Sequence, residues 1–127
     1  MAILQDPIAR AAMTSQEVAK YVIEHLIAQG ERAHKLDYGC RYRHEGKACA
    51  VGCLITDKEY HATFEGTSVG SIVYSNKQKE LENFINNHLE LLKKLQRIHD
   101  QANFDDTDKS VFIDWVKLNA PEVGVSI

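Results

Sequence analysis

The stretch LENFINNHLELLKKLQRIHDQA, residues 81–102, decides the fold class. Apolar side chains recur along it every three or four residues, which is the spacing of one face of an α-helix. The residues on that face are Leu81, Phe84, His88, Leu91, Leu95, Ile98 and Ala102. We therefore predict one helix over about 76–102, about 40 Å long at 1.5 Å per residue. Its seam could fill the core or pair with a second copy of the chain, which makes a homodimer through helix 76–102 an open alternative.

Two further segments have helical patterns. Thr14 and Glu17 have the spacing of a capping box, in which each side chain accepts a hydrogen bond from the backbone N–H of the other. Apolar residues follow at helical spacing, so we predict a helix over about 14–29. A third helix is expected over about 107–119, where Val111, Phe112, Trp115 and Val116 share one face.

The segment 39–66 between these helices has a different character. Residues 39–43 alternate in the two-residue rhythm of a strand, and residues 44–47 contain a late glycine, as a tight turn does. We expect the chain to return as a second strand from residue 48, forming a small β-hairpin. Residues 49–55 suit either a buried strand or a short helix, because so short an apolar run has no decisive periodicity.

These elements predict a predominantly helical α+β fold. The chain has 127 residues, of which 44% are hydrophobic and 26% charged, as in one ordinary globular domain. We therefore expect a single domain over 1–127, in which residues 1–13 could form a flexible N-terminal segment. The core should come mainly from the three helices, with a short helix or turn near Tyr60.

The sequence also limits the cellular compartment and the kinds of binding partner. The first 13 residues lack the pattern of a signal peptide, and the chain contains no apolar run long enough for a membrane span. Three cysteines are an odd number in a chain that can fold without disulfides, which fits a reducing cytoplasm. The formal net charge of −3 argues against general nucleic-acid binding. We expect a cytoplasmic protein with no membrane association.

All three cysteines lie in the segment 40–60. Cys40, His44, Cys49 and Cys53 are four potential zinc ligands within 14 residues, although their spacing departs from that of common structural zinc sites. Cys40 could alternatively be a thiol nucleophile activated by neighbouring cations, with His44 as its base. We favour a third interpretation, in which Cys49 and Cys53 are small buried hydrophobic residues and no cofactor is required.

The same segment is rich in cationic and aromatic side chains. Arg41, Tyr42 and Arg43 interleave two guanidinium groups with one ring, a combination suited to phosphate contact and stacking. Tyr and Arg are also typical anchors of protein interfaces. The candidate binding residues are Arg41, Tyr42, Arg43, Lys47 and Tyr60. The simpler interpretation is a hairpin with its charged side chains outside and with Cys40 and Tyr42 inside.

The pair His99–Asp100 also occurs in metal-dependent phosphohydrolases, but no second histidine pattern supports that activity here. Because His99 lies near the end of the predicted helix, we expect it to interact with the helix dipole and the terminal carbonyl groups.

Two blocks of the chain resemble a group of small, mostly uncharacterised proteins encoded by bacteriophages and prophages. The blocks are Cys40-Arg-Tyr-Arg, Cys49-Ala-Val-Gly-Cys-Leu-Ile, Asp57, Glu59-Tyr60 and Phe64-Glu-Gly66 as the first, and Leu95-Gln-Arg-Ile-His-Asp100 as the second. The resemblance implies a phage-type protein acting in the cytoplasm of a bacterial host, and it implies no residue roles.

Taken together, these features predict a non-enzymatic accessory protein that binds a host or defence macromolecule through the segment 40–60. The alternative is a protein that binds a nucleotide or phosphorylated ligand through the same segment, or a small thiol- or metal-dependent enzyme. These alternatives remain open at the level of the sequence.

Overall fold

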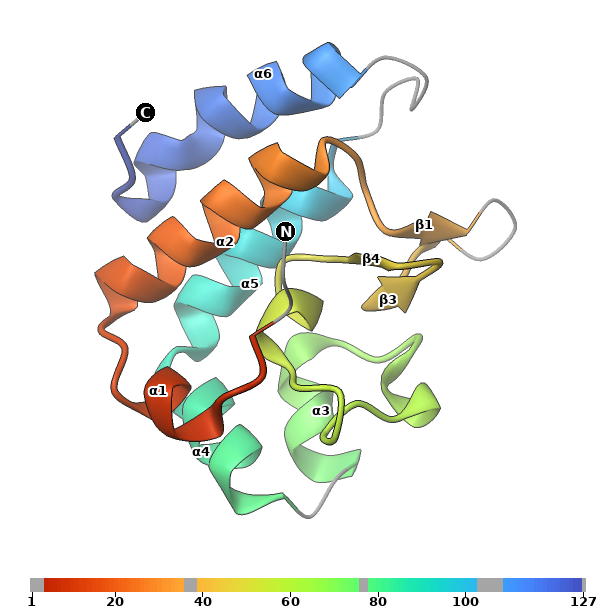
Figure 1. The fold of residues 1–127 in the computed structure, drawn as a ribbon, viewed down its shortest axis with the longest axis vertical. Coiled ribbons are helices and arrows are strands. Elements are labelled where there is room, and N and C mark those ends of the chain that lie inside the picture. Colours follow the sequence, from red (N-terminus) through yellow and green to blue (C-terminus); the bar gives the residue numbers. More distant parts are fainter. Residues whose placement is uncertain (1–3, 36–38, 76–77, 103–108, 127) are drawn as a thin grey trace.

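The computed structural model describes residues 4–35, 39–75, 78–102 and 109–126, and it confirms a predominantly helical α+β fold (Figure 1). The described helices are α1 Pro7–Ala11, α2 Ser15–Gln29, α3 Val69–Ser75, α4 Lys79–Asn87, α5 Leu89–Asp100 and α6 Lys109–Asn119. Short 3₁₀ turns follow at Gly52–Leu54, Ala62–Phe64 and Ala120–Val123. No helix within these ranges is long and apolar enough to cross a lipid bilayer.

Helix α2 forms as its sequence predicts. The hydroxyl of Thr14 accepts a hydrogen bond from the backbone N–H of Glu17 at 3.1 Å. The Glu17 carboxylate accepts one from the backbone N–H of Thr14 at 2.9 Å, which completes the capping box. Gly30 ends the helix with a φ of 77°, a left-handed conformation that glycine adopts without strain.

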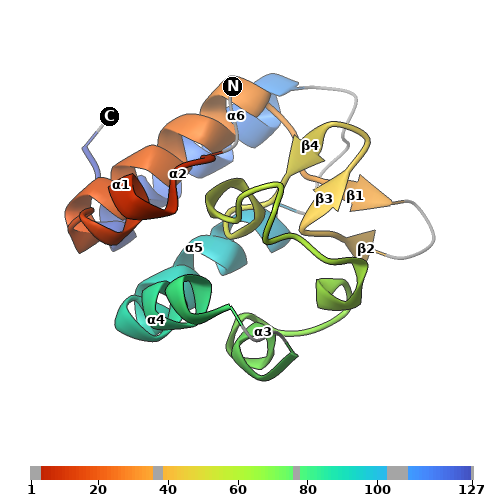
Figure 2. The ribbon, with the colours of Figure 1, turned by 60° about the horizontal axis from the view of Figure 1, so that its bottom comes forward.

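The prediction of one continuous helix over 76–102 is wrong. Helix α4 ends at Asn87 and α5 begins at Leu89, because His88 leaves the helical conformation with φ −125° and ψ 20°. The two helices run in different directions (Figure 2). Helix α4 packs against α1 and α3, whereas α5 packs against α2. The bend lets both helices bury their apolar faces around one core, whereas a straight helix of about 40 Å would extend past it.

The apolar seam of α4 and α5 already fills this core. Leu81, Phe84, Ile85, Leu92, Leu95 and Ile98 are all at most 4% exposed. A homodimer that used this seam would have to remove these side chains from the core of each chain. The contacts within one chain therefore account for the heptad-like spacing.

The predicted hairpin is present, with very short strands. Strand β3, Arg43–His44, pairs antiparallel with β4, Lys47–Ala48. The turn residues Glu45 and Gly46 both have positive φ, at 48° and 79°, as a type I′ turn requires. A second pair, β1 His34–Lys35 with β2 Gly39–Cys40, was not predicted.

Residues 49–55 do not form a strand. They make a tight turn that leads into the 3₁₀ turn Gly52–Leu54, and every residue from 49 to 55 is buried. Gly52 lies so close to the preceding hairpin that an added Cβ would be 2.0 Å from the carbonyl oxygen of Tyr42. The small residues of this segment are thus explained by close backbone packing.

The N-terminal segment contacts the rest of the structure from residue 4 onward. The backbone N–H of Leu4 donates to the carbonyl of Cys53 at 2.9 Å. Arg10 on α1 is fully buried and forms a bidentate ion pair with Glu59, at 2.6 and 2.7 Å. It also donates to the carbonyl of Leu54 at 2.8 Å. Helix α1 is therefore fastened to the segment 54–59.

Helix α6 confirms most of the third predicted helix. Residues 109–119 are helical and pack against α2, while the expected start at 107 lies outside the described residues. Phe112 and Val116 are buried on the face that the sequence indicated, Trp115 is partly buried, and Val111 is exposed.

Candidate functional site

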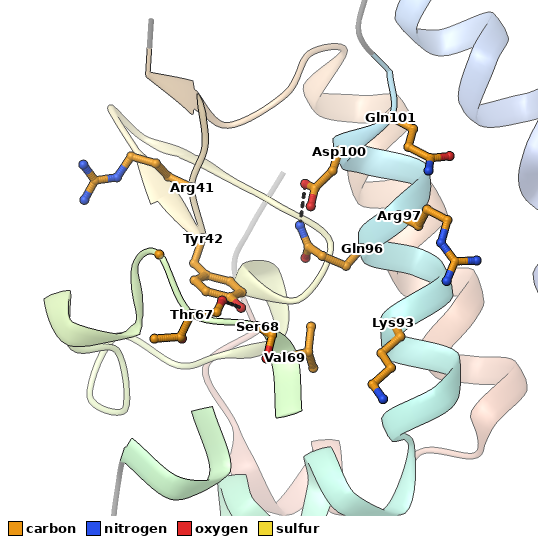
Figure 3. A pocket seen from close by; sticks show the side chains of 11 residues that line it. Arg41, Tyr42, Thr67, Ser68, Val69, Lys93, Gln96, Arg97, Asp100 and Gln101 are labelled. Carbon is orange, nitrogen blue, oxygen red and sulfur yellow. Dashed lines mark hydrogen bonds between the residues drawn. The ribbon is translucent and has the colours of Figure 1, made fainter. Parts of the chain in front are cut away.

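A pocket with a volume of about 650 Å³ lies between the hairpin region and helix α5 (Figure 3). One wall is formed by Tyr42 and by residues 66–69, and the other by residues of α5. The pocket is open to solvent. The α5 residues that line it are Lys93, Gln96, Arg97, Asp100 and Gln101.

Tyr42 is the central side chain of the first wall. Its hydroxyl donates to the carbonyl of Thr67 at 2.6 Å, and its ring is nearly buried. Burial, with a further contribution from the nearby Cys49, raises the pKa of Tyr42 well above its ordinary value. The phenol therefore stays protonated and fixes the position of the 66–69 loop.

Glu65 holds the backbone below this wall. Its carboxylate accepts hydrogen bonds from the backbone N–H groups of Tyr42, at 2.9 Å, and Arg43, at 3.1 Å. The same carboxylate accepts the hydroxyl of Tyr60 at 2.5 Å and lies 3.7 Å from Nε of Arg41. The loop and the hairpin are thus joined through one side chain.

The second wall carries charged and amide groups at helical spacing. Lys93, Gln96, Arg97 and Asp100 share one face of α5 because they are three or four residues apart. Lys93 has an exposed partner, Glu90, at 3.3 Å, which is a weak interaction at the surface. The α5 wall therefore presents two cations and one carboxylate.

Asp100 is held by two side-chain donors. The amide nitrogen of Gln96 donates to Oδ1 of Asp100 at 2.8 Å, while the amide oxygen accepts from the backbone N–H of Val51 at 3.1 Å. Nδ1 of His99 lies 2.7 Å from the same Oδ1. Because Nε2 of His99 accepts the backbone N–H of Ala33 at 3.0 Å, the neutral ring carries its proton on Nδ1 and donates it to Asp100.

His99 therefore has a different role from the one its sequence position indicated. It is fully buried, and its ring bonds to Ala33 and Asp100 instead of the last carbonyl groups of α5. The ring connects the backbone after α2 with a carboxylate at the pocket.

The predicted binding residues are only partly brought together. Arg41 and Tyr42 line the pocket, although the guanidinium of Arg41 points away from α5 (Figure 3). Arg43 instead bonds to Asp57 and to the carbonyl of Ile55, and its guanidinium lies 4.9 Å from the ring centre of Tyr60. Lys47 pairs with Glu31 at 3.0 Å. Arg43 and Lys47 are thus paired with partly exposed carboxylates at the surface, and Tyr60 lies beside Arg43.

Two of the candidate metal or thiol residues lie in the core. Cys49 and Cys53 are fully buried, and burial raises the pKa of both thiols well above the ordinary value. The Cys53 thiol donates to the carbonyl of Ala50 at 3.1 Å. This environment agrees with the interpretation of Cys49 and Cys53 as buried hydrophobic residues.

The proposed metal ligands do not converge within the described residues. His44 is partly exposed on the hairpin, where Nε2 lies 3.8 Å from the carboxylate of Glu45. Among the side chains that the structure describes, no group of three or more His, Cys, Asp or Glu residues is arranged to hold a metal ion. The side chain of Cys40 lies outside that description, so its predicted roles stay predictions.

The sequence reasoning missed the α5 wall as a binding surface. The available signal was the helical spacing of Gln96, Arg97 and Asp100, which places them on one polar face. The structure brings this face of α5 opposite Tyr42 (Figure 3). Two segments about 55 residues apart thus line one pocket.

No known family model matches the chain, and neither curated proteins nor solved structures include a significant match to it. The fold and the pocket are therefore the basis for any functional conclusion.

Proposed function

We propose that this protein binds a small phosphorylated ligand in the pocket between Tyr42 and helix α5. The observation that carries the proposal is the pairing of Lys93 and Arg97, one helical turn apart, on the wall of a pocket of about 650 Å³. An ammonium group and a guanidinium group four residues apart on a helix can reach one phosphate once Arg97, whose guanidinium extends away from Tyr42 in Figure 3, turns toward Lys93. The volume falls in the range of sites for small molecules.

The surrounding groups suit a polar ligand. Thr67 and Ser68 supply hydroxyl groups on the opposite wall, and Gln101 adds an exposed amide. Tyr42 and Val69, each at most 6% exposed, add only a small apolar area to the lining. Such a mixture of a few polar groups with some apolar surface is typical of ligand pockets.

Binding of a host or defence macromolecule through the segment 40–60 has less support. Arg43 and Lys47 are engaged with Asp57 and Glu31, and the ring of Tyr42 is nearly buried. A protein partner would have to displace these contacts or rely on Arg41. We therefore place the phosphorylated-ligand alternative first.

The test measures binding by isothermal titration calorimetry with inorganic phosphate, ribose 5-phosphate and nucleoside mono- and triphosphates. We expect Lys93→Ala and Arg97→Ala each to weaken binding of the phosphorylated compounds about tenfold, because each removes a charged hydrogen bond. Lys94→Ala is the matched control, since Lys94 is also exposed on α5 but does not line the pocket.

Equal losses in the Lys93, Arg97 and Lys94 variants would contradict the proposal, because they would indicate general attraction to positive charge. Absence of binding by every probe would also contradict it. A pull-down from bacterial lysate tests the macromolecular alternative, with Arg41→Ala as the variant. A specific protein captured by the unaltered chain and lost with Arg41→Ala would favour that alternative.

The phage-type resemblance extends this proposal to the cellular location of the protein. A phage protein that binds a phosphorylated metabolite would act in the cytoplasm of the bacterial host, where such compounds are abundant. Expression of the chain in bacteria, followed by cell fractionation, tests the location.

A further inference from the structure

Asp100 is a carboxylate at the edge of a pocket whose other charged groups on α5 are cations. A carboxylate repels a bare phosphate. The fixed position of the Asp100 carboxylate therefore indicates that the ligand carries a second group besides its phosphate. Given the proposed function, this carboxylate bears on the chemical class of the phosphorylated ligand.

The orientation of Asp100 is set from the core. Gln96 and His99 both donate to Oδ1, and they are themselves fixed by backbone N–H groups of Val51 and Ala33. Among the described residues no hydrogen bond is made to Oδ2, and the Asp100 side chain is 43% exposed. One oxygen thus orients the carboxylate, and the other is available as an acceptor at the pocket.

The positions of the charges along α5 separate two subsites. Arg97 and Asp100 are three residues apart, and Lys93 and Asp100 are seven apart, which corresponds to about 5 and 10 Å along the helix axis. An anion held midway between Lys93 and Arg97 would lie about 8 Å along the helix axis from Asp100. A ligand that contacts both subsites must carry its hydrogen-bond donors at some distance from its phosphate.

We infer that the pocket selects a phosphorylated compound that also carries hydroxyl donors, which Asp100 accepts through Oδ2. Sugar phosphates and ribonucleotides share this chemistry, since the ribose hydroxyl groups are separated from the 5′-phosphate by the sugar ring. His99 and Gln96 are positioning residues in this arrangement. The Gln96 amide nitrogen and Nδ1 of His99 are used to hold Asp100. These two groups act on the ligand only through Asp100.

The test compares a ribonucleoside 5′-monophosphate with its 2′,3′-dideoxy counterpart by calorimetry on the unaltered chain. We expect the ribonucleotide to bind about tenfold more tightly, because a hydroxyl donor to a charged acceptor is lost in the dideoxy compound. In Asp100→Asn the difference should fall to less than about threefold, while the dideoxy compound binds at least as tightly as before. The conservative change keeps the shape of the side chain and its Oδ1 acceptor.

Binding of ribose 5-phosphate distinguishes a sugar-phosphate ligand from a ribonucleotide ligand. Affinity equal to that of the ribonucleotide would indicate a sugar-phosphate ligand, and weaker affinity would indicate that the base contributes; both support a hydroxyl subsite. Equal affinity of the unaltered chain for the ribonucleotide and the dideoxy compound would overturn the inference, yet the proposed function would stand if Lys93→Ala still weakened both. Absence of binding by all three compounds would overturn both statements. Because the decisive comparison uses the unaltered chain, it does not depend on whether Asp100→Asn folds.

Discussion

The carbonyl oxygen of Tyr42 occupies the space where a Cβ of Gly52 would lie. The distance from an ideal Cβ to that oxygen is 2.0 Å, far inside any contact that two such atoms make. The same carbonyl accepts the backbone N–H of Cys49 at 3.1 Å, so the hairpin and the following turn are joined at this point. The glycine therefore sets how closely the pocket wall approaches the core.

Substitution of this glycine should be costly. We expect Gly52→Ala to lower the free energy of unfolding by at least about 2 kcal/mol, because a backbone group cannot move aside as a flexible side chain can. Urea denaturation followed by circular dichroism measures the change. Gly70→Ala is the matched control, since an added Cβ there meets no atom within 4 Å and the residue lies in α3. That variant should be neutral or more stable by up to about 1 kcal/mol, and equal destabilisation of the two would contradict the argument.

The buried ion pair of Arg10 and Glu59 provides a second test. Arg10→Met should destabilise the fold by about 3–5 kcal/mol, because it leaves the Glu59 carboxylate buried without its main partner. The double variant Arg10→Met/Glu59→Gln should recover part of this loss, since glutamine removes the buried charge and can still accept the backbone N–H of Thr56. Denaturant unfolding measures both variants. If the double variant is less stable than Arg10→Met alone, the unpaired charge of Glu59 is not the cause of the destabilisation in Arg10→Met.

The burial of His25 makes the stability of the fold depend on pH. Burial lowers the pKa of His25 below its ordinary value of 6.5, although its hydrogen bond to the carbonyl of Ala48 acts in the opposite direction. The unfolded chain then binds a proton near pH 6.5 that the folded chain does not, so stability falls as the pH drops below 6.5. Each such histidine contributes a slope of up to about 1.4 kcal/mol per pH unit.

The matching variant is His25→Gln, because its amide N–H can replace the donor to Ala48. We expect unfolding free energies between pH 5 and 6.5 to show a shallower slope in this variant than in the unaltered chain. Burial also lowers the pKa of His88, so a part of the slope should remain. An unchanged slope would mean that His25 does not titrate differently in the two states.

The thiols of Cys49 and Cys53 should be inert in the folded protein. With Cys40→Ser, only these two thiols remain for reaction with an aromatic disulfide reagent at pH 8. We expect the folded protein to react at least about a thousandfold more slowly than the protein in urea, because reaction requires unfolding and the thiolate is disfavoured by burial. Rapid reaction of either thiol without denaturant would contradict the buried positions. Zinc analysis of the unaltered protein, which keeps Cys40, tests the metal alternative for Cys40 and His44.

Local patterns predicted much of the fold because they depend on neighbours in the chain. The capping box of Thr14 and Glu17, the hairpin turn at Glu45–Gly46 and the apolar face of α6 are interactions between residues at most a few positions apart. The bend at His88 could not be predicted in the same way. The apolar spacing continues through it, and the bend follows from packing against helices α1, α3 and α2.

The sequence by itself therefore determined the helical class of the fold, the ends of α2 and the position of the hairpin, because hydrogen bonds and apolar periodicity within short segments specify these features. It also singled out Arg41 and Tyr42. Only the tertiary structure decided that these residues lie opposite Lys93, Arg97 and Asp100, and that Arg43 and Lys47 pair with Asp57 and Glu31. The physical reason is that a pocket wall is made by contacts between distant segments. The hydrogen bonds from Ala33 to His99 and from Val51 to Gln96, which orient Asp100, exist only once the chain has closed around its core.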